Sequence, residues 1–197
     1  MESAQYWVAL LTMALFTPFL FIWFVVHPFT GMWRRIGPIR TWLCVTGILF
    51  PVPTAVYHFR ESLLVISFGF SWSLAALALV FFVASIIIAG LRGVYLKAAI
   101  RFGWPQLADE ENPGKLLTEG IYSRIRHPTY IEGGLALTSM ALFSNYLAVY
   151  VLLAAYFPLI YLVVLMEERE LSERFGEEYV RYSEEVPRFI PKMRSKI

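Results

Sequence analysis

The chain has 197 residues, of which 58% are hydrophobic and only 16% are charged. Soluble domains carry roughly 25% charged residues, so this composition excludes an ordinary soluble domain. The formal net charge of +2 is too small to indicate nucleic-acid binding, so we expect no nucleic-acid partner. The single cysteine, Cys44, precludes an intrachain disulfide and is expected to be a buried filler residue.

Four stretches almost free of charge are long enough to cross a bilayer, which takes about 20 apolar residues. A fifth stretch, 130–143, is shorter and contains Glu132, but only Ser144 and Asn145 separate it from the next stretch. The sequence therefore predicts an all-α, polytopic membrane protein with five transmembrane helices. Glu2 and no basic residue precede the first stretch, which we interpret as a retained helix. The four longer stretches are Tyr6 to Val26, Thr41 to Tyr57, Trp72 to Leu91 and Tyr146 to Met166.

The basic residues support this count. With five helices, sixteen of the seventeen Lys and Arg residues fall on one side of the membrane, and only Arg60 falls on the other. The positive-inside rule makes the richer side cytoplasmic. We therefore expect a multi-pass protein with a cytoplasmic C-terminus and the N-terminus opposite. Its location would be the plasma membrane in a prokaryote or the endoplasmic reticulum in a eukaryote.

The C-terminal tail is expected to be a cytoplasmic amphipathic surface helix over 167–185. Its apolar residues recur at steps of three and four, which is typical of one helical face. They are Leu171, Phe175, Tyr179, Tyr182 and Val186. We find one membrane domain, 1–197, in which 1–91 is a helical scaffold.

Two polar clusters flank the last hairpin, at 118–134 before the fourth predicted helix and at 167–179 after the fifth. Because the connection between these helices is short, the clusters should face each other. Their basic, acidic and aromatic groups would together suit a zwitterionic amino acid that carries a nucleoside. A carboxylate inside an apolar helix is costly, so Glu132 should face the bundle interior or reach the interface.

Simpler interpretations of these clusters stand beside that one. Arg124 and Arg126 are also typical of positive-inside anchors, and Tyr122 and Tyr130 of an interfacial aromatic belt. The pair Glu167 and Glu168 is equally typical of a solvated helix start. We expect no metal site, because the other histidines do not accompany His127. The motifs of soluble dinucleotide-binding folds, P-loops and nucleophile elbows are absent.

The C-terminal part nevertheless resembles a known family. The run from Arg126 to Tyr130 (RHPTY) with glycines after it, then Glu167 and Glu168, then 175–179 (FGEEY) and Val186-Pro187, resembles isoprenylcysteine carboxyl methyltransferases. Phospholipid N-methyltransferases share part of the pattern. The resemblance covers about residues 112–191 and is nearest to the compact prokaryotic members.

The resemblance implies S-adenosyl-L-methionine as cofactor, with S-adenosyl-L-homocysteine as product, bound within 92–197. It also implies a lipid or lipidated acceptor, such as a prenylcysteine carboxylate, at the bilayer. His127 or a nearby basic residue would hold the methionyl carboxylate, Glu167 the ammonium, and Leu116, Leu117 and Tyr122 would flank the adenine. The full set of expected cofactor contacts is Gly114, Lys115, Leu116, Leu117, Tyr122, His127, Pro128, Thr129, Tyr130, Glu167 and Glu168.

Several alternatives stay open. Eukaryotic members have a substrate-contacting arginine where this chain has Val163, which leaves the prenylcysteine acceptor in question. A lipid amine is the other candidate acceptor, and Glu168 or Glu132 could then be the base. An NADPH-dependent membrane reductase of sterols or enones looks similar over the His-Pro segment and tail. A small transporter or assembly subunit is the non-enzymatic reading, but it predicts ionisable residues in the middle of several spans. The pattern names no catalytic residue and no oligomeric state.

Overall fold

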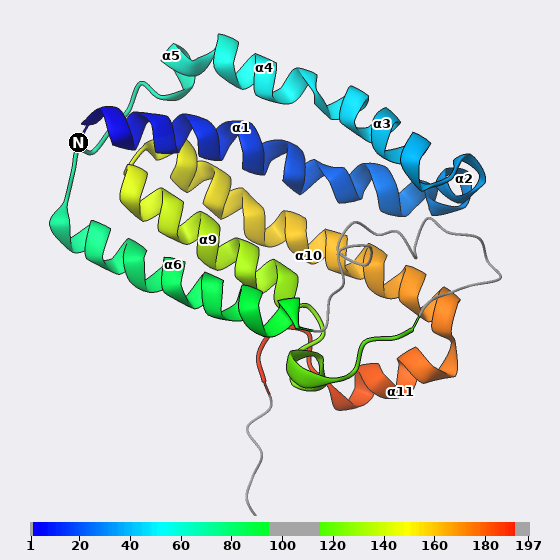
Figure 1. Cartoon of the computed structure of the whole chain (residues 1–197). Helices are drawn as coiled ribbons and strands as arrows, with labels where there is room; N and C mark the ends of the chain where they lie inside the picture. The colour runs from blue at the N-terminus through cyan, green and yellow to red at the C-terminus, as the bar shows by residue number, and fades with distance from the viewer. Residues whose placement is uncertain (1, 95–114, 192–197) are drawn as a thin grey trace, which may run out of the picture.

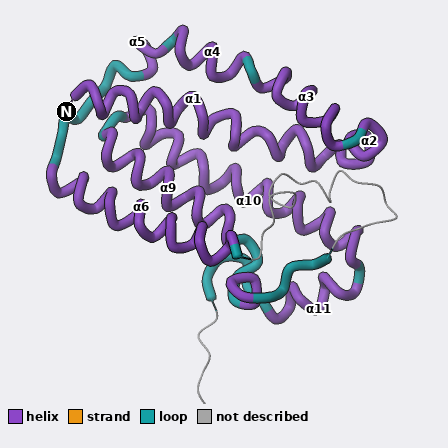
Figure 2. Tube along the Cα trace, in the orientation of Figure 1, coloured by secondary structure: helices purple, strands orange, loops and turns teal. Residues whose placement is uncertain are grey.

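The computed structural model describes residues 2–94 and 115–191, in which every extended regular element is a helix (Figures 1 and 2). One isolated antiparallel bridge joins Ser67 to Tyr146. In chain order the helices are α1 (Glu2–Val26), η1 (His27–Phe29), α2 (Thr30–Ile36), α3 (Pro38–Leu49), α4 (Pro51–His58), α5 (Arg60–Leu63), α6 (Trp72–Gly93), η2 (Gly120–Ser123), α9 (Pro128–Ser144), α10 (Leu147–Phe175) and α11 (Glu177–Glu185).

Four helical stretches in the described ranges are long and apolar enough to cross a membrane. They are Glu2–Ile36, Pro38–His58, Trp72–Gly93 and Leu147–Phe175. The all-α class is thus confirmed over the described residues, together with several helices that are long and apolar enough to span a membrane. The fifth span is still a prediction, because its helix α9 has 17 residues and is not among these four.

The long helices run along one another in a bundle (Figure 1). Helix α9 packs against α6, α1 and α10, while α3 and α4 pack on the other side of α1. Successive long helices run in alternating directions, so the C-terminal ends of α1, α6 and α10 meet the start of α9 at one end of the bundle. This arrangement brings together segments that are far apart in the chain.

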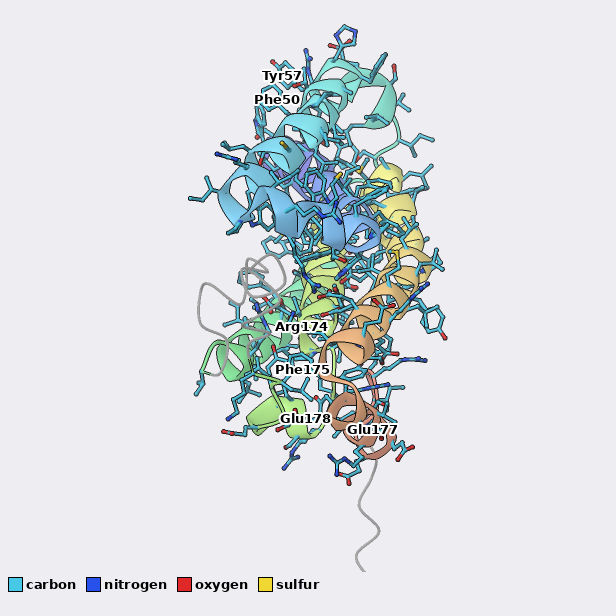
Figure 3. All side chains as sticks on the ribbon, turned by 90° about the vertical axis from the view of Figure 1, so that its right-hand side faces the viewer. Phe50, Tyr57, Arg174, Phe175, Glu177 and Glu178 are labelled. Atoms are coloured by element: carbon cyan, nitrogen blue, oxygen red, sulfur yellow. The ribbon has the colours of Figure 1, made fainter. Side chains whose placement is uncertain are left out.

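The interior of the bundle is small and its surface is apolar. Leu137 and Ala141 of α9 and Val163 and Val164 of α10 are fully buried. Large apolar side chains are exposed elsewhere, as a bilayer requires, and Figure 3 shows Phe50 and Tyr57 at the outer edge of the α3–α4 layer. The expectation of a buried Cys44 is wrong, because this residue is exposed on α3.

The start of the predicted tail helix is also wrong. Residues 167–175 continue α10 without a break, so the acidic pair is part of the long helix itself. The helix ends at Gly176, whose φ of +53° is strained for any residue with a side chain. A separate helix, α11, then begins at Glu177 and folds back beneath the bundle (Figure 1).

Candidate cofactor and acceptor site

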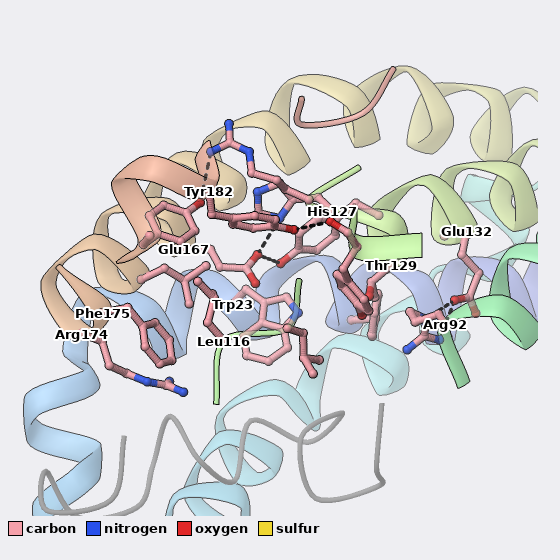
Figure 4. Close-up of a pocket in the computed structure, with 18 of the residues that line it drawn as sticks. Trp23, Arg92, Leu116, His127, Thr129, Glu132, Glu167, Arg174, Phe175 and Tyr182 are labelled. Carbon is pink, nitrogen blue, oxygen red and sulfur yellow. Dashed lines mark hydrogen bonds and ion pairs between the residues drawn. The ribbon is translucent and has the colours of Figure 1, made fainter. Parts of the chain in front are cut away.

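A cavity of about 580 Å³ opens at the end of the bundle where α10 turns into α11 (Figure 4). Its walls come from both halves of the chain, including α1, α6, η2, α9, α10 and α11. The lining residues are Leu15, Phe16, Phe19, Trp23, Arg92, Lys115, Leu116, Leu117, Tyr122, Arg126, His127, Thr129, Tyr130, Glu132, Gly133, Ala136, Glu167, Leu171, Arg174, Phe175, Tyr179 and Tyr182. The mixture of apolar walls and a few charged groups is typical of small-molecule sites of this size.

Glu167 presents a carboxylate to this cavity. Its Oε2 atom accepts a hydrogen bond of 2.8 Å from the Tyr130 hydroxyl and lies 3.4 Å from Nδ1 of His127. Among the described residues, no group donates a hydrogen bond to its Oε1 atom, and the side chain is 21% exposed. One carboxylate oxygen is therefore fixed by the protein, and the other is available to a ligand.

Glu168 is held from three sides and does not line the cavity. Arg126 Nη2 lies 3.0 Å from its Oε1 atom, and Nε2 of His127 lies 3.1 Å from the same oxygen. Arg188 donates to both oxygens, with the Nη2 to Oε2 distance at 2.7 Å. Fork-shaped contacts of this kind are the strong ones among ion pairs. Glu168 thus fixes the chain segments around the cavity.

His127 bridges the two glutamates. Burial lowers its pKa, but the hydrogen bonds and negative charges of Glu167 and Glu168 outweigh burial, so the pKa is raised above its ordinary value of 6.5. Both ring nitrogens already face carboxylates. The family resemblance implied that His127 or a nearby basic residue holds the methionyl carboxylate. Because both nitrogens of His127 are occupied, this geometry favours the nearby basic residue.

Two arginines fit that role. Arg126 and Arg174 line the cavity, and the Nε atom of each is buried without a hydrogen-bond partner in the described part of the chain. Arg174 also forms an ion pair with Glu170, with 3.4 Å between Nη1 and Oε1. The other oxygen of Glu170, Oε2, lies 3.3 Å from Nδ1 of His27 in η1. A buried donor without a partner is unfavourable, so a bound anion would satisfy a real need.

The C-terminal tail packs against the segment that leads into α9, at the edge of the cavity. After α11, the backbone carbonyls of Pro187 and Arg188 accept hydrogen bonds from the amides of Arg126 (2.9 Å) and His127 (3.1 Å). The Tyr182 hydroxyl donates to the carbonyl of Tyr122 at 2.7 Å, which ties α11 to η2. Burial raises the pKa of Tyr122 to about 12, so its hydroxyl stays a hydrogen-bond donor near neutral pH.

The two polar clusters therefore face each other as the sequence predicted. Tyr122 and Tyr130 are 7% and 6% exposed, too buried for an interfacial belt, and the side chains of Glu167 and Glu168 are only 21% and 12% exposed and pair with His127. Arg124 is exposed and keeps the simpler reading as an anchor. Of the expected contacts, Lys115, Leu116, Leu117, Tyr122, His127, Thr129, Tyr130 and Glu167 line the cavity.

Two expected contacts do not line the cavity, and the position of a third is not described. Pro128 is the buried first residue of α9, and Glu168 lies behind the cavity wall. Gly114 falls outside the described residues. The cofactor roles of the whole set are still predictions.

Sequence reasoning missed the contribution of the first helix. Leu15, Phe16, Phe19 and Trp23 of α1 line the cavity, although 1–91 was expected to be scaffold. The signal was present, because residues 15, 19 and 23 recur every four positions and mark one helical stripe. In an apolar membrane helix, however, such a stripe does not stand out from lipid-facing residues.

Comparison with known proteins agrees with this picture. A family model described as "Phospholipid methyltransferase" matches residues 70–178, more than half of the chain and most of the cavity. The chain belongs to this family, whose members are membrane methyltransferases.

Two curated relatives carry names from metal resistance. The cobalt-zinc-cadmium resistance protein CzcN of Cupriavidus metallidurans is 31% identical over 53% of this chain and 48% of its own. The nickel-cobalt-cadmium resistance protein NccN of Alcaligenes xylosoxydans xylosoxydans is 26% identical over 56% of this chain and 52% of its own. The chain thus spans about half the length of the curated relatives it matches. No solved structure matches it. Within 2–94 and 115–191, no three His, Cys, Asp or Glu side chains are grouped to hold a metal ion.

Proposed function

We propose that the protein is an S-adenosyl-L-methionine-dependent methyltransferase that acts on a lipid or lipidated acceptor at the membrane. The observation that carries this proposal is a cavity that combines three features beside apolar helices long enough to span a membrane. Among the described residues, they are the Glu167 carboxylate with one oxygen unpaired, arginines with an unpaired Nε atom, and aromatic walls. Membership of the phospholipid methyltransferase family supports the reaction class.

The donor set fits the cofactor group by group. The free Oε1 atom of Glu167 would accept a hydrogen bond from the methionyl ammonium. Arg126 or Arg174 would take the methionyl carboxylate, since each has a buried Nε without a partner. Leu116, Leu117 and Tyr122 would flank the adenine. A charge-assisted hydrogen bond in a buried site contributes roughly 1.5–3 kcal/mol, so these contacts would dominate affinity.

The chemistry asked of the protein is modest. The bound cofactor supplies a methyl group on a sulfonium, and its C–S bond breaks as the acceptor atom forms a bond to the methyl carbon. The protein's own contribution is to align the acceptor and exclude water. Leu171, Phe175 and Tyr179 form an apolar cover on the α10–α11 side that serves this exclusion.

A lipid acceptor is supported by the apolar α1 wall, which continues to the outer surface of the bundle. Leu15 is 65% exposed and Phe19 is 39% exposed, yet both line the cavity. A lipid tail could therefore enter from the bilayer while a soluble cofactor enters from the cytoplasm. The resemblance offers two acceptor groups, the carboxylate of a prenylcysteine-like molecule and, as the alternative, the amine of a phospholipid.

The topology is part of the proposal. The end of the bundle that holds the cavity also holds the clustered arginines, whereas Arg60 lies in α5 at the other end (Figure 1). We therefore assign this end to the cytoplasm. Reaction of an engineered cysteine at exposed Arg181 with an impermeant maleimide in sealed, right-side-out vesicles would contradict this assignment. A cysteine-free background, in which exposed Cys44 is replaced by Ser, is needed for that measurement.

Ligand-induced stabilisation tests the cofactor directly. The full chain in detergent is heated with S-adenosyl-L-homocysteine, S-adenosyl-L-methionine or NADPH, because a ligand at 100 times its Kd stabilises the native state by about 2.7 kcal/mol. We expect both adenosyl compounds to raise the melting temperature and NADPH to leave it unchanged. Stabilisation by NADPH alone would favour the membrane reductase, and stabilisation by none of them would favour a non-enzymatic role.

A further inference from the structure

A partly buried ion pair joins α6 to α9 at the far side of the cavity from Phe175 (Figure 4). The Nε atom of Arg92, in the last turn of α6, donates to Oε2 of Glu132 at 2.7 Å, and Nη2 contacts the same oxygen. Their side chains are 6% and 23% exposed. The hydroxyl of Ser85 donates to the backbone carbonyl of Glu132 at 3.1 Å and fixes the register of the two helices.

The pair leaves one donor and one acceptor unused. The Nη1 atom of Arg92 is buried and has no hydrogen-bond partner among the described residues. No described group donates to Oε1 of Glu132, since both arginine contacts go to Oε2. Both residues line the cavity, so the unpaired donor and the unpaired acceptor belong to side chains that border a bound molecule. In a purely structural ion pair, Nη1 or another arginine nitrogen would be expected to contact Oε1 as well, because two parallel contacts are stronger than one.

The wall next to this pair is apolar. Leu15, Phe16 and Phe19 of α1 face the same cavity as Gly133 and Ala136 of α9. Gly133 has no room for a side chain, because a Cβ there would lie 2.7 Å from the Tyr156 hydroxyl. This part of the cavity thus combines one polar pair with an apolar wall that continues to the bilayer-facing surface.

We propose that Arg92 and Glu132 form the head-group subsite for the acceptor, and that the group they select is an uncharged hydroxyl on an apolar chain. The hydroxyl donates to Oε1 of Glu132 and accepts from Nη1 of Arg92, while the chain lies along the α1 wall. This inference rests on the proposed function for its meaning as an acceptor site, but the binding itself needs no cofactor.

Charge balance is the reason for an uncharged group. The pair is neutral as a whole, so a carboxylate that approaches Arg92 also meets the negative charge of Glu132. An ammonium that approaches Glu132 also meets the positive charge of Arg92. A hydroxyl is both donor and acceptor and satisfies both free atoms at once. The subsite therefore argues for a hydroxyl over the carboxylate and over the charged amine.

Photolabelling of the full chain in lipid nanodiscs tests the preference. Three probes share one diazirine-bearing ten-carbon chain and end in a hydroxyl, a carboxylate or an ammonium. Labelled peptides are quantified by mass spectrometry, and labelling of 12–24 and 128–144 is divided by labelling of the lipid-facing α4 to correct for partition into the bilayer. We expect the corrected signal of the alcohol to exceed that of either charged probe by roughly five-fold or more. Equal corrected labelling by the three probes would overturn the subsite.

Variants test whether Arg92 and Glu132 cause the preference for the alcohol probe. The double variant Arg92→Met with Glu132→Leu leaves no buried unpaired charge. It should label equally with all three probes, because their shared apolar chain still binds. The matched control is Arg169→Met with Glu173→Leu, an exposed pair on α10, which should keep it. A preference that survives in the first variant would overturn the assignment to Arg92 and Glu132.

Binding of S-adenosyl-L-homocysteine, measured by calorimetry on the same samples, separates the two proposals. Binding without an alcohol preference removes the subsite alone. A preference without cofactor binding removes the methyltransferase proposal alone. The comparison of the three probes on the wild-type protein tests the subsite even if the double variant folds poorly.

Discussion

The two ends of the helical bundle are built from different chemistry. At the end where α9 turns into α10, the side-chain amide of Gln5 donates to the backbone carbonyls of Gly69, Phe143 and Ser144 at 3.2–3.3 Å. Asn145 takes the left-handed conformation that ends α9, and its amide donates to Gly69 at 2.8 Å. We call this the amide end. All of these groups are neutral.

The opposite end, which we call the charged end, holds the cavity. Ion pairs of 3.4 Å or less meet there, and they join Glu168 to Arg126, His127 and Arg188, and Glu167 to His127. Arg126 and Arg174 each keep a buried nitrogen without a hydrogen-bond partner in the described part of the chain. Neutral amides can satisfy backbone groups completely, whereas buried charges without full pairing are costly unless a ligand completes them. The amide end is therefore satisfied by the protein itself, whereas the charged end has unpaired groups that the proposed ligand would complete.

The largest expected effect is loss of ligand affinity at the charged end in Glu167→Gln. The variant removes the negative charge next to the ligand and should weaken S-adenosyl-L-homocysteine binding by about 2–3 kcal/mol, or roughly 30- to 150-fold. Isothermal titration calorimetry measures it. Glu173→Gln, an exposed residue on the same helix, is the control and should bind normally. Unchanged affinity in Glu167→Gln would rule out the proposed contact.

The amide end should show the reverse behaviour. Gln5 is 2% exposed, and Gln5→Leu removes the donor to the backbone carbonyls of Phe143 and Ser144, while the Gly69 carbonyl keeps its hydrogen bond from Asn145. We expect a loss of about 2 kcal/mol in the free energy of unfolding, seen as a lower melting temperature, with ligand affinity intact. Glu2→Gln, at an exposed position of the same helix, controls for the N-terminal turn. Impaired binding at normal stability would show that the two ends are not separate in function.

A smaller effect is expected from the tail. Arg188 is 36% exposed in its side chain, so Arg188→Ala should weaken ligand binding by only about 1 kcal/mol, roughly five-fold, through loss of the clamp on Glu168. Arg188→Lys keeps the positive charge but loses the two-point contact with Glu168, so its ligand affinity should lie between those of the wild type and Arg188→Ala. Arg181→Ala on the exposed side of α11 is the control. Equal affinities across the series would mean that the tail does not position the site.

The smallest expected effect is a pH dependence confined to the charged end. Because the pKa of His127 is raised, its stabilising pairs are fully present below its ordinary value of about 6.5 and are lost as the pH rises through the raised value. The melting temperature should therefore fall on that interval in the wild type and less so in His127→Gln. The Gln5→Leu variant should keep the wild-type slope, since this substitution changes no titratable group. A slope that is unchanged in His127→Gln would assign the dependence to another group.

The sequence predicted the elements that depend on local pattern. Charge-free stretches locate the spanning helices because a bilayer admits almost no charge, and the short link at Ser144 and Asn145 forces α9 and α10 to be neighbours. That neighbourhood was enough to bring Glu167 within reach of Tyr130. The break at Gly176 was not foreseen, since the apolar face of the tail continues in phase across it and only the backbone dihedral reveals the turn.

By itself, then, the sequence determined the all-helical membrane class and the two segments that carry the candidate cofactor contacts, because both follow from spacing along one hairpin. Tertiary structure alone decided which atoms are free. It satisfied both nitrogens of His127, placed Glu168 behind the wall, and left Oε1 of Glu167 open. It also brought α1 and Arg92 to the cavity over long distances in the chain. Such long-range packing follows from how whole helices fit against one another, which no local pattern encodes.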